Sequence, residues 1–292
     1  MTADIKETTR ARILAEGFGF PQSPRWHDGK LWFSDLLGGQ IHVIDEAGQN
    51  VAVVDIGDQA CGLDWSPRGY LMAATTEGKL LRFDGRRLVE FADLSGMTDC
   101  HLNDLLVDPS GRAYVSCSGF DDQQTTAPRP TRLILVEKNG FAHAVGIDLL
   151  YANGMAITPN GQTLLVAETF AGRISAFNIA TDGTLDCHRV WAPLSGLMPN
   201  GLCIDGEGAV WVASPMSGEV LRVREGGEIL HRISITGNPT ACVLGGDGGR
   251  TLFVTATKLI SMRRRSGRID AIQVAIGATD KTDVFRPARD RP

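Results

Sequence analysis

The chain has 292 residues, of which 43% are hydrophobic and 22% are charged, a balance typical of a globular protein with a substantial core. Its net charge of −5 disfavours nucleic acids and anionic membranes as partners. The first residues lack the apolar segment of a secretory leader, and no uncharged apolar run reaches the length of a membrane span. We therefore expect a cytoplasmic protein that binds neither nucleic acid nor membrane, and the sequence carries no signal for an oligomeric state.

One phrase recurs six times along the chain: a small or polar residue, an apolar stretch, a turn with Gly, and a second short apolar strand. In chain order the copies are QSPRWHDGKLWFSD from Gln22, CGLDWSPRGYLMAAT from Cys61, NDLLVDPSGRAYVS from Asn103, NGMAITPNGQTLLVAET from Asn153, NGLCIDGEGAVWVAS from Asn200 and TACVLGGDGGRTLFVTAT from Thr240. The alternation of apolar and polar residues within these runs, bounded by Gly, Asp and Pro, predicts antiparallel strands. A repeat of roughly 40–50 residues built from short strands is typical of propeller blades.

The two ends of the chain suggest how such a propeller would close. RARILAEGF near the start and GRIDAIQVAIGAT near the end have strand character and lie outside the six copies. Pairing them within one blade would remove the open edge of the ring. We predict an all-β protein, a single six-bladed β-propeller over residues 1–292 with an axial pocket, and loose termini at 1–14 and 284–292.

The first residue of each copy is the predicted site. Because every copy occupies the same place in its blade, these six leading residues should form one ring around the axis. They are all neutral: Gln22, Cys61, Asn103, Asn153, Asn200 and Thr240. Such a ring predicts a polar pocket for a small-molecule substrate.

Together, the phrases SPRWHDGKLWFSD, HLNDLLVDPSGRAYVS, YANGMAITPNGQTLLVAET and PNGLCIDGEGAVWVAS resemble the regucalcin/gluconolactonase family, which is also called senescence-marker-protein-like. The resemblance covers nearly the whole chain. It implies a six-bladed propeller that hydrolyses sugar lactones with one divalent metal on its axis. In that family the metal ligands are a Glu in the first phrase, an Asn in the fourth and an Asp in the fifth. An Asn in the third phrase lies near metal and substrate.

This chain departs from the family pattern at both carboxylates. It keeps the asparagines as Asn103 and Asn153, but the Glu position is Gln22 and the Asp position is Asn200. Calcium and magnesium prefer anionic oxygen ligands, and affinity follows ligand charge. We therefore expect no tightly bound metal and no other cofactor. A weak Ca²⁺ or Mg²⁺ site would use Gln22, Asn153 and Asn200, and the four amides would instead bind substrate.

Two residues are candidates for catalysis. His101 stands where the family has an Arg, two residues before Asn103, so strand alternation directs it toward the pocket mouth. A neutral imidazole there could act as general acid or base, or simply be a hydrogen-bonded structural histidine. Asp121, or its neighbour Asp122, lies in a polar insertion over residues 118–130 and could orient His101 or hold a substrate hydroxyl. The alternative for either acid is a solvated loop residue.

Three functions remain open on this sequence. The first is hydrolysis of a lactone by a lactonase-like enzyme, and the second is metal-independent acid–base chemistry, such as isomerisation, cyclisation or elimination with His101 moving the proton. Both would act on a small cyclic or carbonyl-containing molecule in the axial pocket. The third is a non-catalytic small-molecule binding or sensor protein with the same pocket.

Overall fold

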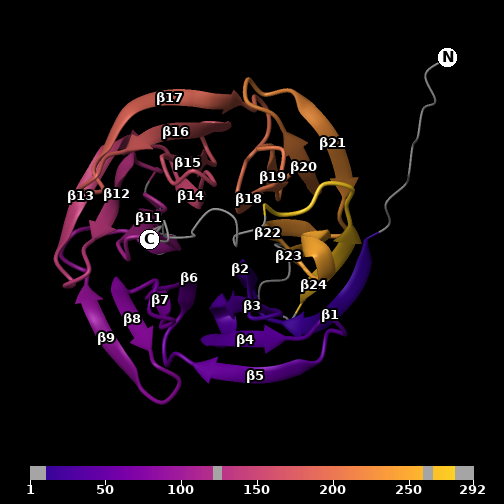
Figure 1. Ribbon diagram of the computed structural model, residues 1–292, viewed down its shortest axis with the longest axis horizontal. Helices are drawn as coiled ribbons and strands as arrows, with labels where there is room; N and C mark the ends of the chain where they lie inside the picture. Colours follow the sequence, from indigo (N-terminus) through magenta and orange to yellow (C-terminus); the bar gives the residue numbers. More distant parts are fainter. Residues whose placement is uncertain (1–10, 121–126, 259–265, 280–292) are drawn as a thin grey trace, which may run out of the picture.

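Six four-stranded antiparallel sheets surround a central axis in the computed structural model, which describes residues 11–120, 127–258 and 266–279 (Figure 1). This arrangement confirms the predicted all-β, six-bladed propeller. Five blades run in chain order from an inner strand at the axis to an outermost strand at the rim. Within the described ranges no helix is long and apolar enough to cross a membrane, and the two helical segments are single 3₁₀ turns, η1 (Leu36–Gly38) and η2 (Asp247–Gly249).

The strands have the same four ranks in every blade. The inner strands are β2 (Pro21–His27), β6 (Ala60–Trp65), β10 (Leu102–Val107), β14 (Ala152–Ile157), β18 (Leu202–Ile204) and β22 (Asn238–Gly245). The second strands are β3 (Lys30–Asp35), β7 (Leu71–Thr75), β11 (Ala113–Cys117), β15 (Thr163–Glu168), β19 (Val210–Ser214) and β23 (Thr251–Thr257). The third strands are β4 (Gln40–Ile44), β8 (Lys79–Phe83), β12 (Thr131–Val136), β16 (Arg173–Ile179), β20 (Glu219–Val223) and β24 (Gly267–Gln273). The outermost strands are β5 (Asn50–Asp55), β9 (Leu88–Asp93), β13 (Ala142–Leu149), β17 (Leu185–Pro193), β21 (Ile229–Ser234) and β1 (Arg12–Phe18).

The ring closes through both ends of the chain, as predicted. β1 pairs antiparallel with β24, so the sixth blade has the order β1-β24-β23-β22. The predicted boundary of the loose N-terminus at residue 14 is wrong, because β1 begins at Arg12 and the side chain of Leu14 is buried in the hydrophobic core. The apolar side chains of RILAEGF complete the closing blade. The predicted loose C-terminus at 284–292 lies outside the described residues.

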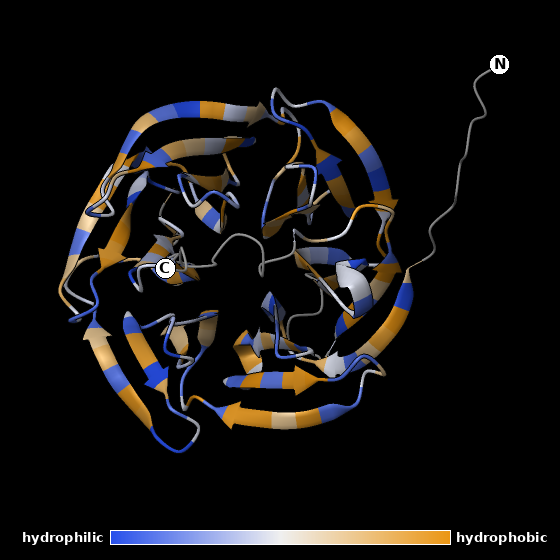
Figure 2. Cartoon of the chain, in the orientation of Figure 1, coloured by the Kyte–Doolittle hydropathy of each residue, from blue (hydrophilic) through white to orange (hydrophobic). Residues whose placement is uncertain are grey.

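The core lies between neighbouring blades. Second strands such as β7, β11 and β19 are buried along their whole length, because a blade packs against each of their faces. Outermost strands such as β5 are largely exposed, and Figure 2 shows both hydrophilic and hydrophobic residues on the strands at the rim. Burial on both faces explains the continuous apolar runs in the second strand of each phrase.

The inner strands approach one another closely around the axis. A Cβ at Gly154 would lie 2.6 Å from the Cα of Gly201, and a Cβ at Gly201 would lie 2.6 Å from the Cα of Ala241. Neither distance is compatible with a side chain. The glycine after the leading residue in the fourth and fifth phrases is therefore required for the strands to converge, and convergence holds the leading residues around one axial space.

Candidate functional site

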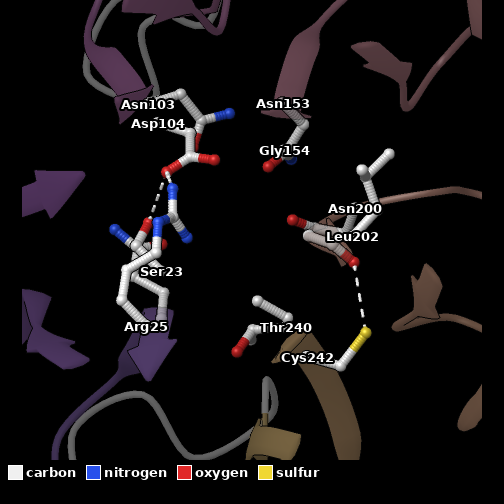
Figure 3. A pocket seen from close by; sticks show the side chains of 13 residues that line it. Ser23, Arg25, Asn103, Asp104, Asn153, Gly154, Asn200, Leu202, Thr240 and Cys242 are labelled. Atoms are coloured by element: carbon white, nitrogen blue, oxygen red, sulfur yellow. Dashed lines mark hydrogen bonds and ion pairs between the residues drawn. The ribbon is translucent and has the colours of Figure 1, made fainter. Parts of the chain in front are cut away.

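A pocket lies on the propeller axis among the inner strands, with an empty volume of about 290 Å³ including its open side (Figure 3). Five of the six leading residues line it, as the repeat predicts. The lining consists of Gln22, Ser23, Arg25, Asn103, Asp104, Asn153, Gly154, Asn200, Gly201, Leu202, Thr240, Ala241 and Cys242. The structure thus brings together the four amide residues predicted to bind substrate.

The leading residue and its successor both line the pocket in five blades, against the alternation of a regular strand. The cause is a register irregularity near the start of most inner strands. In β10 the pairing skips from Leu102 to Leu105, and in β14 it skips from Ala152 to Met155. A bulge of this kind turns two adjacent side chains toward the same face.

Cys61 is the exception among the leading residues, and its predicted place in the ring is wrong. Its thiol is buried in the core between blades and donates to the carbonyl oxygen of Ala74 at 3.3 Å. Burial raises the pKa of this thiol. The backbone of Cys61 still serves the site, because its carbonyl oxygen accepts a hydrogen bond from Gln22.

Three of the leading amides each donate one side-chain N–H to the protein. Gln22 Nε2 donates to the carbonyl oxygen of Cys61 at 3.1 Å, and Asn103 Nδ2 donates to the backbone oxygen preceding Asn153 at 3.2 Å. Asn153 Nδ2 donates to Thr169 Oγ1 at 3.2 Å. The oxygens of these three amides receive no hydrogen bond from the residues that the structure describes. The ring therefore offers acceptors, which suit a ligand that carries hydroxyl groups.

A partly buried guanidinium also lines the pocket. Arg25 Nη2 donates to Asp104 Oδ1 at 3.1 Å and to the carbonyl oxygen of Leu105 at 2.7 Å, and Nη1 donates to the carbonyl oxygen of Pro24 at 3.0 Å. Burial by itself would lower the pKa of Arg25, but the negative charges of Asp104 and Asp64 outweigh it and raise that pKa. The guanidinium is therefore a permanent cation in the pocket wall.

The partner carboxylate is fully hydrogen-bonded. Asp104 is only 5% exposed, and its Oδ1 accepts from Ser23 Oγ at 2.9 Å as well as from Arg25. Its Oδ2 accepts from the backbone amide of Met155 at 3.3 Å. Figure 3 shows Ser23, Arg25 and Asp104 together on one side of the pocket, across from Asn153 and Asn200. One side of the pocket is thus charged and the other is neutral.

Sequence reasoning missed Arg25, although the repeat carries a signal for it. The third residue after the leading one is, in chain order, Arg25, Asp64, Leu106, Ala156, Cys203 and Val243. Four of the six are small or apolar, so a charged residue at this inner-strand position is out of pattern. The first residue after the leading one is charged only in the third copy, where it is Asp104. Comparing the copies position by position would have found both partners.

The two predicted catalytic residues differ in what the structure describes. His101 directly precedes β10, is partly buried, and places Nδ1 3.4 Å from the carbonyl oxygen of Thr76 in the neighbouring blade. It precedes the lining residue Asn103 by two positions and is not among the residues that line the pocket. Asp121 and Asp122 lie outside the described residues, so their proposed roles stay predictions.

The donor set does not fit a tight calcium or magnesium site. Gln22, Asn153 and Asn200 can offer only neutral amide oxygens, and affinity for these cations follows ligand charge. Asp104, the one carboxylate lining the pocket, already accepts from three donors. Across the ranges that the structure describes, no three His, Cys, Asp or Glu side chains are grouped as metal ligands. At most the ring matches a weak divalent site.

Known proteins resemble the chain in sequence and fold. A 6-deoxy-6-sulfogluconolactonase of Pseudomonas putida is 26% identical over 81% of this chain and 83% of its own length. A pentonolactonase of Haloferax volcanii is 26% identical over 85% of this chain and 84% of its own. Among solved structures, a calcium-binding regucalcin from Agrobacterium tumefaciens superimposes with a TM-score of 0.77 at 18% identity, covering 93% of this chain and 97% of that one.

Two of these relatives are lactonases by name, and the solved regucalcin structure shares the fold. The family model described as SMP-30/Gluconolactonase/LRE-like region matches residues 20–258. This range runs from β2, the first inner strand, to β23 in the closing blade. That match includes the five pocket-lining leading residues. The chain belongs to the SMP-30/gluconolactonase family.

Proposed function

We propose that this protein hydrolyses a small, hydroxylated lactone bound in the axial pocket. The observation that carries the proposal is the convergence of Gln22, Asn103, Asn153 and Asn200 on one axial space. Their amide oxygens accept hydrogen bonds from hydroxyl groups, which a sugar-like lactone supplies. The lactonases among the relatives support the same reaction class.

In this proposal His101 is the general base. The structure places its Nδ1 3.4 Å from the carbonyl oxygen of Thr76. Water attacks the lactone carbonyl carbon while the His101 imidazole takes one of its protons. The ring C–O bond then breaks and the alkoxide takes the proton back, which yields a hydroxy acid. Asp121 keeps its predicted role in orienting His101 or a substrate hydroxyl.

A lactone panel tests the proposal. Proton release from hydroxylated five- and six-membered lactones would be followed with a pH indicator, with added Ca²⁺ or Mg²⁺ and with chelator. We expect turnover that survives chelation, because the candidate metal ligands Gln22, Asn153 and Asn200 offer only neutral amide oxygens. His101→Gln should lower kcat by about 10²–10⁴-fold and leave thermal stability nearly unchanged. The matched control is His231→Gln, on the outermost strand β21.

Other outcomes have defined meanings. Tight binding of panel members without turnover would show that the protein is a non-catalytic binding or sensor protein and not a hydrolase. Release of a product other than the hydroxy acid would favour metal-independent acid–base chemistry. Turnover that chelation abolishes would show that neutral oxygens suffice to hold a metal. Full activity in His101→Gln would return His101 to a structural role.

A further inference from the structure

Arg25 has donors to spare. Both hydrogens of Nη2 are used, on Asp104 and Leu105, and Nη1 uses one hydrogen on Pro24. The Nε–H and the second hydrogen of Nη1 have no acceptor among the residues described here. A guanidinium carries five N–H groups, so two of them are left unbonded on a side chain that lines the pocket.

The guanidinium lies just below the ring of amides. Its contacts with Asp104 and Leu105 place it one to two residues beyond Asn103 along β10. At about 3.3 Å per residue, this is roughly 3–7 Å deeper along the axis. The amides and the guanidinium can therefore contact a single small molecule, with acceptors above and donors below.

The charges around Arg25 restrict what its free donors can bind. Asp104 contacts the guanidinium, and Asp64 is the next acid to act on its pKa. Asp64 is held by the backbone amides of Val107 at 2.7 Å and Trp65 at 2.9 Å, so it cannot turn away. One cation beside two fixed carboxylates repels a third carboxylate, and a neutral acceptor oxygen does not meet this repulsion.

We propose that Arg25 is the floor of the pocket and selects an uncharged cyclic ester or amide over its ring-opened carboxylate. Its free N–H groups donate to the carbonyl or ring oxygen of the bound molecule, while Asp104 and Asp64 exclude the anion. This deepens the proposed function and rests on it, since it makes Arg25 the residue that distinguishes lactone from product. The hydroxy acid then leaves the pocket by charge repulsion.

The test uses stable analogues and does not need turnover. The full-length protein would be titrated at pH 7.5 with hydroxylated five- and six-membered lactams, and with the hydroxy acid of the same carbon chain. We expect the best lactam to bind at least about tenfold tighter than its hydroxy acid. Arg25→Lys keeps the positive charge but loses the planar set of donors. It should weaken lactam binding about ten- to hundredfold, the range for a hydrogen bond to a charged group.

Two further variants complete the experiment. Arg268→Lys changes a second partly buried arginine paired with an aspartate, in the closing blade, and should leave lactam binding unchanged. If Arg25→Lys fails to fold, Arg25→Gln with Asp104→Asn removes both charges together and should lose the preference for lactam. Equal or tighter binding of the hydroxy acids, unchanged binding in the Arg25 variants, or no lactam binding would each overturn the inference. Failure of the lactone panel with lactam binding intact would overturn only the hydrolase.

Discussion

Two of the arginine–aspartate pairs in this propeller join a partly buried arginine to a buried aspartate, one in the pocket and one in the closing blade. Asp104 of the pocket pair accepts hydrogen bonds on both oxygens, from Ser23 and Arg25 and from a backbone amide. Asp270 of the closing blade is fully buried and meets Arg268 through Oδ2 at 3.0 Å. Its Oδ1 has no partner among the described residues.

The two pairs differ in how completely the aspartate is hydrogen-bonded. A carboxylate with both oxygens bonded is held in place and keeps its partner in place, which a binding site needs. A buried carboxylate oxygen without a hydrogen-bond partner has lost its contacts with water and has gained no protein contact in return. Burial raises the pKa of Asp270, and the opposing effect of Arg268 does not cancel it. The pocket pair is thus held by hydrogen bonds on both carboxylate oxygens, whereas in the closing-blade pair one carboxylate oxygen has no partner among the described residues and the pKa of the acid is raised.

The largest expected effect is on the pocket pair. Asp104→Asn leaves the partly buried Arg25 without its anion and should lower the free energy of unfolding by about 3 kcal/mol, at the lower end of the range for breaking a buried pair. Asp148→Asn is the matched control, because its pair with Arg132 is exposed on both sides. That change should cost less than about 1 kcal/mol. Urea unfolding of both variants measures the contrast, and equal losses would contradict it.

The fold could be predicted from the sequence because the strand pattern of one blade recurs six times. A strand pair that recurs with a Gly-containing turn has one closed arrangement, and apolar runs such as RILAEGF had an evident place in the closing blade. Local pattern and global fold agree at these positions.

The site could be predicted only in part, because bulges break the alternation of side chains along the inner strands. Nothing in the sequence of the third copy states that both Asn103 and Asp104 face the axis, and Cys61 turns into the core where the repeat placed it in the ring. The contact between Arg25 and Asp104 joins residues 79 positions apart. Such pairing depends on how blades meet, which strand patterns do not specify.

The second prediction concerns the divalent-cation affinity of the leading amides, which have no negative charge. The wild type should bind Ca²⁺ or Mg²⁺ no tighter than about millimolar. Gln22→Glu with Asn200→Asp adds two anionic oxygens without changing side-chain length, and should raise affinity at least about tenfold, or about 1.4 kcal/mol. Asn160→Asp with Gln162→Glu makes the same chemical change on an exposed turn and should not. Calorimetry measures all three, and tight binding by the wild type would refute the neutral ring.

The smallest effect concerns the closing-blade pair and its dependence on pH. Because the pKa of Asp270 is raised, the folded protein holds this proton at pH values where the unfolded chain has lost it. The resulting stabilisation is fully present below about pH 3.9, the ordinary aspartate value, and is lost as the pH rises through the folded-state pKa.

Asp270→Asn cannot ionise, so it should gain stability relative to the wild type as the pH rises through that window, by roughly 1 kcal/mol, and then level off. Urea unfolding between pH 4 and 8 measures the difference at each pH. The exposed Asp148→Asn should remain parallel to the wild type throughout. A difference between Asp270→Asn and the wild type that does not change with pH would mean that Asp270 stays ionised in the fold. Arg268 alone would then satisfy its charge, and the two pairs would differ in hydrogen bonding but not in protonation.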